Sequence, residues 1–227
     1  MGRFAPSLVF VCAALGSTAA QADVFHDYED LTEGFLGTSL SHAGVTYRDA
    51  NTVSGFYPDG NPFNDTELGN QFIIENATLF YNDFPGYGSP VNSLTFGSAY
   101  IPGTNLTIGA LASAWMDLDI PGTAASLDLA YYENGPWGGI EYILAAVQGG
   151  NVVATDSFVI SDLGGRDNPT YATLSVSGVE FDSLHLYAWL NGAYTAPRGM
   201  IDNLSITSIP EPTALLGLAL LAALRRR

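Results

Sequence analysis

The chain has 227 residues, of which 23 are acidic and seven are arginine, and since none is lysine its formal net charge at neutral pH is −16. So strong a negative charge repels phosphate backbones, which excludes nucleic acid as a partner. The charged fraction is nevertheless only 13%, and 47% of the residues are hydrophobic. The composition therefore predicts a folded domain rather than a disordered acidic tail.

The first 22 residues contain the three parts of a secretory signal peptide. Arg3 supplies a positive start, residues 8–15 form an apolar centre, and Ala20-Gln21-Ala22 is a small-residue cleavage site. We expect the mature chain to begin at Asp23. The only cysteine, Cys12, lies inside this segment, so thiol chemistry is excluded for the mature protein.

Residues 23–209 form the body, in which short segments of β-type composition recur. Turn signals such as Gly149-Gly150-Asn151 and several Pro-Gly pairs separate them, and no long stretch of helical periodicity intervenes. The main expected strands are 45–47, 71–75, 78–81, 91–96, 105–111, 114–120, 126–132, 142–148, 152–160, 172–176, 183–190 and 200–207. This pattern predicts one all-β domain, an antiparallel β-sandwich of jelly-roll type.

Carboxylates near both ends of the body form a candidate metal site. If Met200 and Leu204 face the core, Asp202 shares their face, where an unpaired carboxylate is costly. Since the first and last strands of a sandwich often lie close, Asp202 could share a structural Ca²⁺ with acidic residues of the first segment, namely Asp27, Glu29 and Asp30. The alternative is that Asp202 accepts backbone donors or pairs with one of the arginines of the body, namely Arg48, Arg166 and Arg198.

Three tryptophans are candidates for stacking on sugar rings. Trp115 shares a strand face with Asp117, Trp189 lies opposite the apolar residues of its strand, and Trp137 is expected at the tip of a glycine-rich loop. Such rings could form an aromatic platform for carbohydrate. The alternative is that they fill a second core face or cover strand edges.

An enzyme has little support among the motifs. The chain has no Gly-x-Ser-x-Gly, Ser-x-x-Lys or His-Glu-x-x-His sequence, and its only histidines are His26, His42 and His185. Carboxylate pairs such as Asp117 and Asp119 keep a secreted glycosidase open as an alternative. Because the motifs of known catalytic sites are missing, we nevertheless expect no catalytic residue.

Residues 210–227 consist of Pro210-Glu211-Pro212, an apolar run over 213–224, and the basic cluster Arg225, Arg226 and Arg227. The prolines allow a short hydrophobic helix only from about residue 213. Such a helix reaches about 18 Å, less than the roughly 30 Å hydrocarbon core of a bilayer. The arginines hold the terminus on the cytoplasmic side, so the body is left outside the inner membrane, anchored there at least transiently.

These three parts, in this order, resemble the PEP-CTERM sorting signal of exported bacterial proteins. The resemblance implies that, after export by the secretion machinery, Pro210, Glu211 and Pro212 are read by an exosortase, a membrane-embedded transpeptidase-like enzyme whose substrate is this chain. Exosortase systems are associated with exopolysaccharide, so the resemblance also implies a non-enzymatic role at the cell surface or in the extracellular matrix. The leading alternative is a carbohydrate-binding module of that matrix.

Overall fold

The computed structural model describes residues 23–49, 54–56, 62–64, 70–78, 87–101, 106–109, 113–131, 139–160, 170–190, 193–194 and 199–209. Its strands are β1 (Val24–His26), β2 (Gly34–Gly37), β3 (Ser39–His42), β4 (Val45–Asp49), β5 (Ser54–Phe56), β6 (Pro62–Asn64), β7 (Asn70–Asn76), β8 (Asn92–Ile101), β9 (Leu106–Gly109), β10 (Ser113–Tyr131), β11 (Glu141–Gln148), β12 (Asn151–Val159), β13 (Thr170–Leu190), β14 (Ala193–Tyr194) and β15 (Gly199–Ser208).

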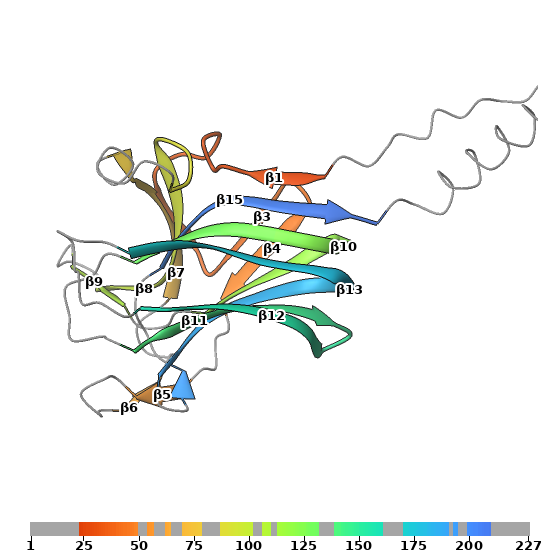
Figure 1. Ribbon diagram of the computed structural model, residues 1–227. Helices are drawn as coiled ribbons and strands as arrows, with labels where there is room; N and C mark the ends of the chain where they lie inside the picture. The colour runs from red at the N-terminus through yellow and green to blue at the C-terminus, as the bar shows by residue number, and fades with distance from the viewer. Residues whose placement is uncertain are drawn as a thin grey trace, which may run out of the picture. The chain divides into compact units, whose positions relative to one another are not determined.

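All described strands except the small β5–β6 ribbon belong to one sheet, and every pair in it is antiparallel. The sheet follows the order β12-β11-β13-β10-β15-β8-β7-β2, with β1 beside β15 and the β3–β4 pair beside β10 (Figure 1). This pairing confirms the predicted all-β antiparallel class. The jelly-roll connectivity stays a prediction.

Two long strands, β10 and β13, bend and so change their neighbours along their length. Residues 113–118 of β10 pair with β4 and with residues 183–187 of β13, whereas residues 122–131 pair with β15 and with the earlier part of β13. The register shifts at Gly122. A Cβ there would lie 2.8 Å from the Phe181 ring and 3.0 Å from Ile206 Cγ2, so only glycine allows this close approach.

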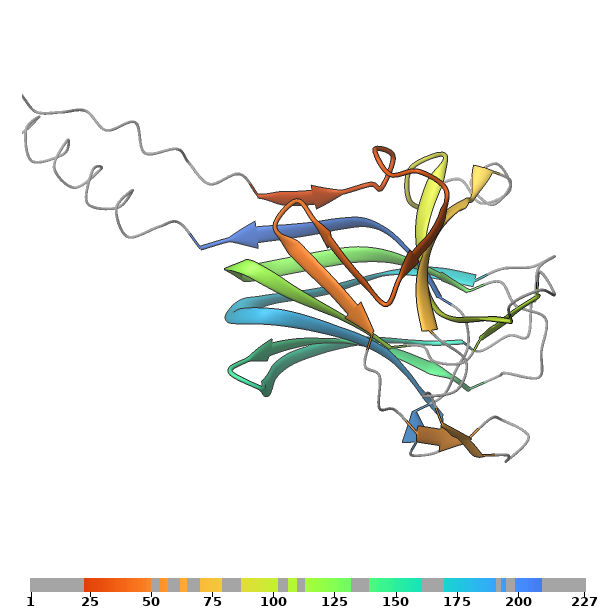
Figure 2. The same cartoon turned by 180° about the vertical axis from the view of Figure 1, so that it is seen from behind.

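The bend divides the sheet into two layers around one core. The first layer comprises β3, β4, residues 113–118 of β10, residues 183–190 of β13, β11 and β12; the second comprises β1, β2, β7, β8, β15 and the remaining parts of β10 and β13. In Figure 2, which views the molecule from behind, β3 and β4 (orange) lie in front. Buried residues of both layers pack together, among them Met116, Leu144 and Leu186 of the first and Leu127, Leu174 and Leu204 of the second.

A bulge in β15 corrects the predicted side-chain alternation of the last strand. Asp202 lies opposite Asp128, but Ser205 lies opposite Ser126, so β15 contains one extra residue, and Asn203 has a φ of 46°. Leu204 therefore faces the main core, whereas Met200 belongs to a separate small cluster with Ala77, Tyr87 and Ala130. The assumption that Met200 and Leu204 share one face is wrong, because an inserted residue reverses the alternation between them.

A buried chain of hydrogen bonds joins β1 to β4. The His26 ring donates from Nε2 to the Ala43 carbonyl oxygen (3.3 Å), which leaves Nδ1 to accept from the Tyr47 hydroxyl (2.6 Å). Tyr47 in turn accepts from the Tyr28 hydroxyl at 3.0 Å. Burial raises the pKa of both tyrosines, so both remain donors. This chain links the first layer to the edge strand β1 of the second.

The two ends of the body meet at one edge of the second layer. Val24 of β1 lies opposite Ile206 of β15, and the Ser208 backbone N–H donates to an Asp23 carboxylate oxygen at 3.3 Å. The Ile209 N–H also donates to the Pro121 carbonyl oxygen at 3.0 Å. Ordered structure thus extends to both expected boundaries of the body.

We expect Tyr47→Phe to lower the free energy of unfolding by about 2–4 kcal/mol, because the buried His26 acceptor and the buried Tyr28 donor both lose their partner. Tyr28→Phe is the matched control. It removes the last hydroxyl of the chain and leaves the His26–Tyr47 bond in place, so it should cost only about 1 kcal/mol. Urea unfolding measures both values, and equal losses in the two variants would contradict this reading.

Candidate functional site

Aromatic side chains gather on the outer face of the first layer. Ala114 and Met116 of β10 point into the core, so Trp115 between them points outward. Trp115 lies directly between two cross-strand neighbours, Arg48 of β4 and His185 of β13. The same alternation places two further rings of β13 on this outer face, namely Tyr187 and Trp189.

Both ring faces of Trp115 are covered by side chains of this protein. The His185 ring stacks on the indole, with centroids 4.1 Å apart and an interplanar angle of 7°. The Arg48 guanidinium carbon lies 4.9 Å from the indole centroid. Because β4 and β13 flank β10 on opposite sides, the two contacts cover opposite faces of the ring. Trp115 therefore stacks against side chains of its own chain and does not offer a flat platform for a sugar.

Arg48 also fixes the neighbouring carboxylate of Asp117. Its Nε and Nη2 donate to the two oxygens of Asp117 at 2.5 and 3.1 Å, which is a bidentate pair. The two side chains remain 45% and 42% exposed, so the pair contributes little to stability. It does engage both Asp117 oxygens, and this weakens the case for Asp117 as a glycosidase acid or nucleophile.

His185 is held by a buried hydrogen bond that the sequence motifs did not indicate. The Ser113 hydroxyl lies 2.7 Å from its Nε2, across the β10–β13 pair. Burial, reinforced by the charge of Arg48, lowers the pKa of His185 to about 4, so the ring is neutral at neutral pH. A serine bonded to a neutral imidazole is the arrangement of a nucleophile and its base. Ser113 is only 1% exposed, however, so the bond serves to orient the ring against Trp115.

Trp115, His185, Tyr187 and Trp189 form an aromatic row on the outer face. Its half-buried end consists of Tyr187 and Trp189. The His185 and Tyr187 centroids are 4.7 Å apart, and the Tyr187 and Trp189 centroids are 6.3 Å apart at an interplanar angle of 78°. The row thus connects Trp115 to Trp189 through ring contacts, but its last two rings meet edge to face. Trp137 lies outside the described residues.

The acidic residues of the first segment are engaged separately. Asp27 accepts the Glu29 N–H at 3.2 Å. Glu29 accepts the backbone N–H groups of Val91 and Asn92, and so caps the start of β8. Asp30 lies 3.4 Å from Nε2 of His42, with which it forms an ion pair when that ring is protonated.

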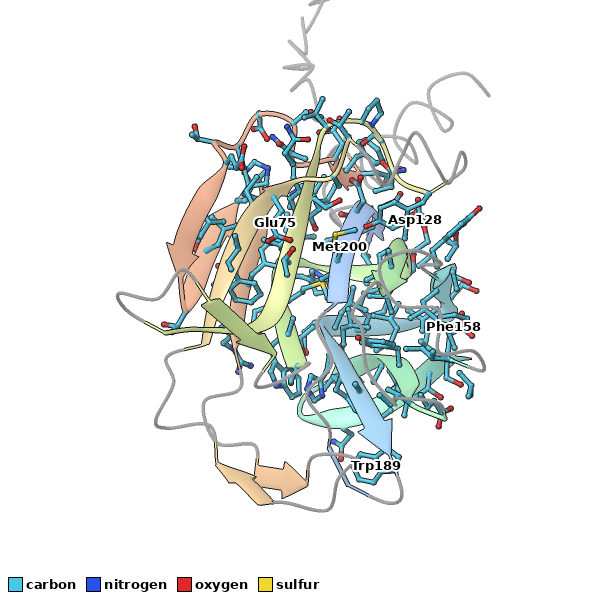
Figure 3. All side chains as sticks on the ribbon, turned by 90° about the vertical axis from the view of Figure 1, so that its left-hand side faces the viewer. Glu75, Asp128, Phe158, Trp189 and Met200 are labelled. Atoms are coloured by element: carbon cyan, nitrogen blue, oxygen red, sulfur yellow. The ribbon has the colours of Figure 1, made fainter. Side chains whose placement is uncertain are left out.

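Asp202, which is fully buried, is held by backbone donors. It accepts the Ser89 N–H at 2.9 Å and the Asn203 N–H at 2.7 Å. Its cross-strand partner Asp128 accepts the Gly88 N–H at 3.1 Å, together with the hydroxyl of Thr173 and the side-chain amide of Asn203. The two carboxylates therefore clamp residues 88–89 onto the second layer. Figure 3 labels Asp128 and Met200 in the upper half of the view and Trp189 near its lower end.

The structure does not bring the four predicted calcium ligands together. Within the described ranges, which include Asp27, Glu29, Asp30 and Asp202, no group of three or more acidic, histidine or cysteine side chains is placed to hold a metal ion. Asp27, Glu29 and Asp202 instead accept backbone N–H groups, and Asp30 lies beside His42. The alternative reading of Asp202, as an acceptor for backbone donors, describes what is observed.

The residues of the two terminal signals, with one exception, belong to the undescribed ends of the chain. Ala20, Ala22 and the sorting residues of 210–227 lie outside the described residues, and only Asp23 of the expected cleavage site lies within them. Among the described residues, no helix has the length and hydropathy needed to cross a membrane.

Two buried histidines predict a loss of stability in mild acid. The pKa of His26 and of His185 falls to about 4 in the folded protein, against 6.5 for an exposed histidine. The unfolded chain therefore binds more protons between these values, so this stability is complete above pH 6.5 and is lost as the pH falls towards 4. Each histidine contributes at most about 3 kcal/mol.

Urea unfolding at about pH 7.5 and pH 5 measures the effect. His185→Gln cannot be protonated, so it should show a smaller difference between the two pH values than the native protein. A free energy of unfolding that is equal at both pH values would contradict the prediction.

No protein-family model and no curated protein matches the sequence. Among solved structures, the chain is similar to the K2 cleaved adhesin domain of Lys-gingipain, at 12% identity and a TM-score of 0.46 over 83% of this chain and 99% of that one. The K1 cleaved adhesin domain from Porphyromonas gingivalis W83 gives 12% identity and a TM-score of 0.43 over the same shares. The CBM22-1 xylan-binding domain of Paenibacillus barcinonensis Xyn10C gives 10% identity and a TM-score of 0.33 over 79% and 97%. Similarity at this level says nothing about ligand.

Proposed function

We propose that this chain is an exported, non-enzymatic β-sandwich protein of jelly-roll type, sorted through residues 210–227 by an exosortase and acting at the cell surface or in the extracellular matrix. The observation that carries this proposal is that the first and last strands of the body lie at its two expected processing boundaries and pair with each other. β1 begins at Val24, the second residue of the expected mature chain, and β15 ends at Ser208, which only Ile209 separates from Pro210-Glu211-Pro212.

The contacts that join the two ends of the body lie within the body itself. The pairing of β1 with β15 and the Ser208–Asp23 hydrogen bond involve only residues 23–209. The core and the buried chain of Tyr28, Tyr47 and His26 also lie inside these bounds. A domain with this organisation can be cut at both ends and remain folded, as the sorting route requires.

A non-catalytic role is supported by how the polar side chains of the candidate site are used. Asp117 is bound by Arg48 through both oxygens, and Ser113 is buried beneath the aromatic row. Asp202 accepts backbone donors of the 88–89 segment and its own strand. General acid–base or nucleophilic chemistry needs such groups accessible to substrate.

A second candidate function, carbohydrate binding, is favoured by the aromatic row. Tyr187 and Trp189 are half-buried on the outer face of the first layer, at the end away from the Arg48–Asp117 pair. Ile143 and Ser157 continue this face beside Tyr187, and Glu141 lies opposite Trp189, so the rings there have apolar neighbours and one carboxylate. Neutral sugar rings stack on such surfaces through their apolar faces.

The sorting proposal predicts a processed C-terminus. Intact mass of the protein recovered from its native host should lack residues after the Pro210-Glu211-Pro212 motif. A host without exosortase, or a variant with these three residues changed to alanine, should yield the chain with Arg225, Arg226 and Arg227 retained. If the arginines are retained in every sample, the tail is a simple anchor and the exosortase assignment is wrong.

The carbohydrate proposal predicts that Trp189→Ala weakens binding about tenfold or more, as expected for the loss of about 1.4 kcal/mol of stacking. Affinity electrophoresis in gels containing exopolysaccharide purified from the native host measures this, with a thermal melt to show that the variant is folded. Trp115→Phe is the control, because the covered ring of Trp115 predicts lower stability with unchanged binding. Equal loss of binding in both variants would count against a site at Tyr187 and Trp189.

A further inference from the structure

The outermost strand of the first layer, β12, lacks the residues that usually prevent another strand from pairing with a sheet edge. It pairs only with β11 among the described strands and lies at the end of the sheet (Figure 1). Its sequence, Asn151–Val159, contains no lysine, arginine or proline, which are residues that commonly block edge pairing. Three of its valines are exposed, namely Val152 (61%), Val153 (40%) and Val159 (50%).

The only charged residue of β12, Asp156, is turned toward the other layer. Asp156 lies opposite Leu144, and its neighbours on that face, Ala154 and Phe158, pack against the main core. The Asp156 Oδ2 atom accepts the Ser175 backbone N–H at 2.7 Å. The carboxylate therefore spans from the edge of the first layer to β13 in the second.

Asp156 satisfies a backbone donor on each of two open edges. In the second layer, the described pairing of β13 around Ser175 is with β10 alone, so the Ser175 N–H that Asp156 accepts points away from β10. On β12 itself, Asp156 Oδ1 accepts the Ser157 N–H at 2.9 Å. Each of these N–H groups is one of the donors that a strand added to its own edge would use. One side chain thus caps one backbone donor on each edge.

We infer that the free edge of β12 is a strand-addition surface for a second copy of this chain, which Asp156 holds closed. A second copy suits this edge because two identical strands can pair antiparallel across a two-fold axis. The net charge of −16 opposes contact between copies elsewhere, but the only charge of this strand points inward. A basic partner, by contrast, would find no outward carboxylate on β12.

Asp156→Ala tests the inference in the exported protein, with light scattering after size exclusion as the readout. Loss of both caps should produce a concentration-dependent species of about twice the native mass. Asp27→Ala is the matched control, because it removes the same charge and also uncaps a backbone N–H, that of Glu29, away from β12. It should keep the native mass.

Adding Ser157→Pro to Asp156→Ala locates the contact. Proline removes the Ser157 N–H, which bonds to Asp156 rather than to a neighbouring strand, and edge strands tolerate proline at such positions. The double variant should return to the native mass. Association that persists in the double variant, or a folded Asp156→Ala variant that keeps the native mass at all concentrations, would overturn the inference.

Should Asp156→Ala fail to fold, Asp156→Asn takes its place. Asparagine keeps the shape of the side chain but has only one accepting oxygen, so it can cap only one of the two donors. It should associate more weakly and should also be reversed by Ser157→Pro. A folded Asp156→Asn protein that keeps the native mass throughout would equally overturn the inference.

Discussion

The two-layer structure depends on the continuity of β10 and β13 through the bend at Gly122. Were either strand to end there, the two layers would be separate sheets joined by loops. Because the strands continue, backbone hydrogen bonds run from one layer into the other, and Phe181 and Ile206 fill the space left by the missing Cβ of Gly122. The position of the aromatic row follows from this bend, since it sets which residues of β10 and β13 face outward.

The acidity of the chain has a structural use as well as an electrostatic one. Glu29, Asp128, Asp156 and Asp202 each accept at least one backbone N–H from a segment distant in sequence. A carboxylate suits this role because it accepts several hydrogen bonds and donates none. In a body with few basic residues, backbone donors take the place that lysine and arginine fill in many proteins. Two of the four carboxylates proposed as calcium ligands, Glu29 and Asp202, are used in this way.

The strand content and antiparallel class were predictable because alternation and turn residues are local signals. Trp115 and Trp189 were assigned to outward faces for the same reason. The bulge at Asn203 was not predictable, because an extra residue in a strand leaves no mark in the alternation until the partner strand is known. The Pro121–Gly122 pair was interpreted as the end of a strand, although it bends one. The Ser113–His185 bond and the Arg48 contact with Trp115 depend on register between strands far apart in sequence, which a single sequence does not specify.

The meeting of β1 and β15 also determines how mechanical force would enter the domain. A body tethered through the residue that follows Ile209 would be pulled at the end of β15, which pairs with β10 on one side and with β1 and β8 on the other. Tension along this strand shears many backbone hydrogen bonds together instead of opening them one at a time. The point of attachment would thus coincide with one of the most extensively paired strands of the sheet, and the domain would resist extension where a tether holds it.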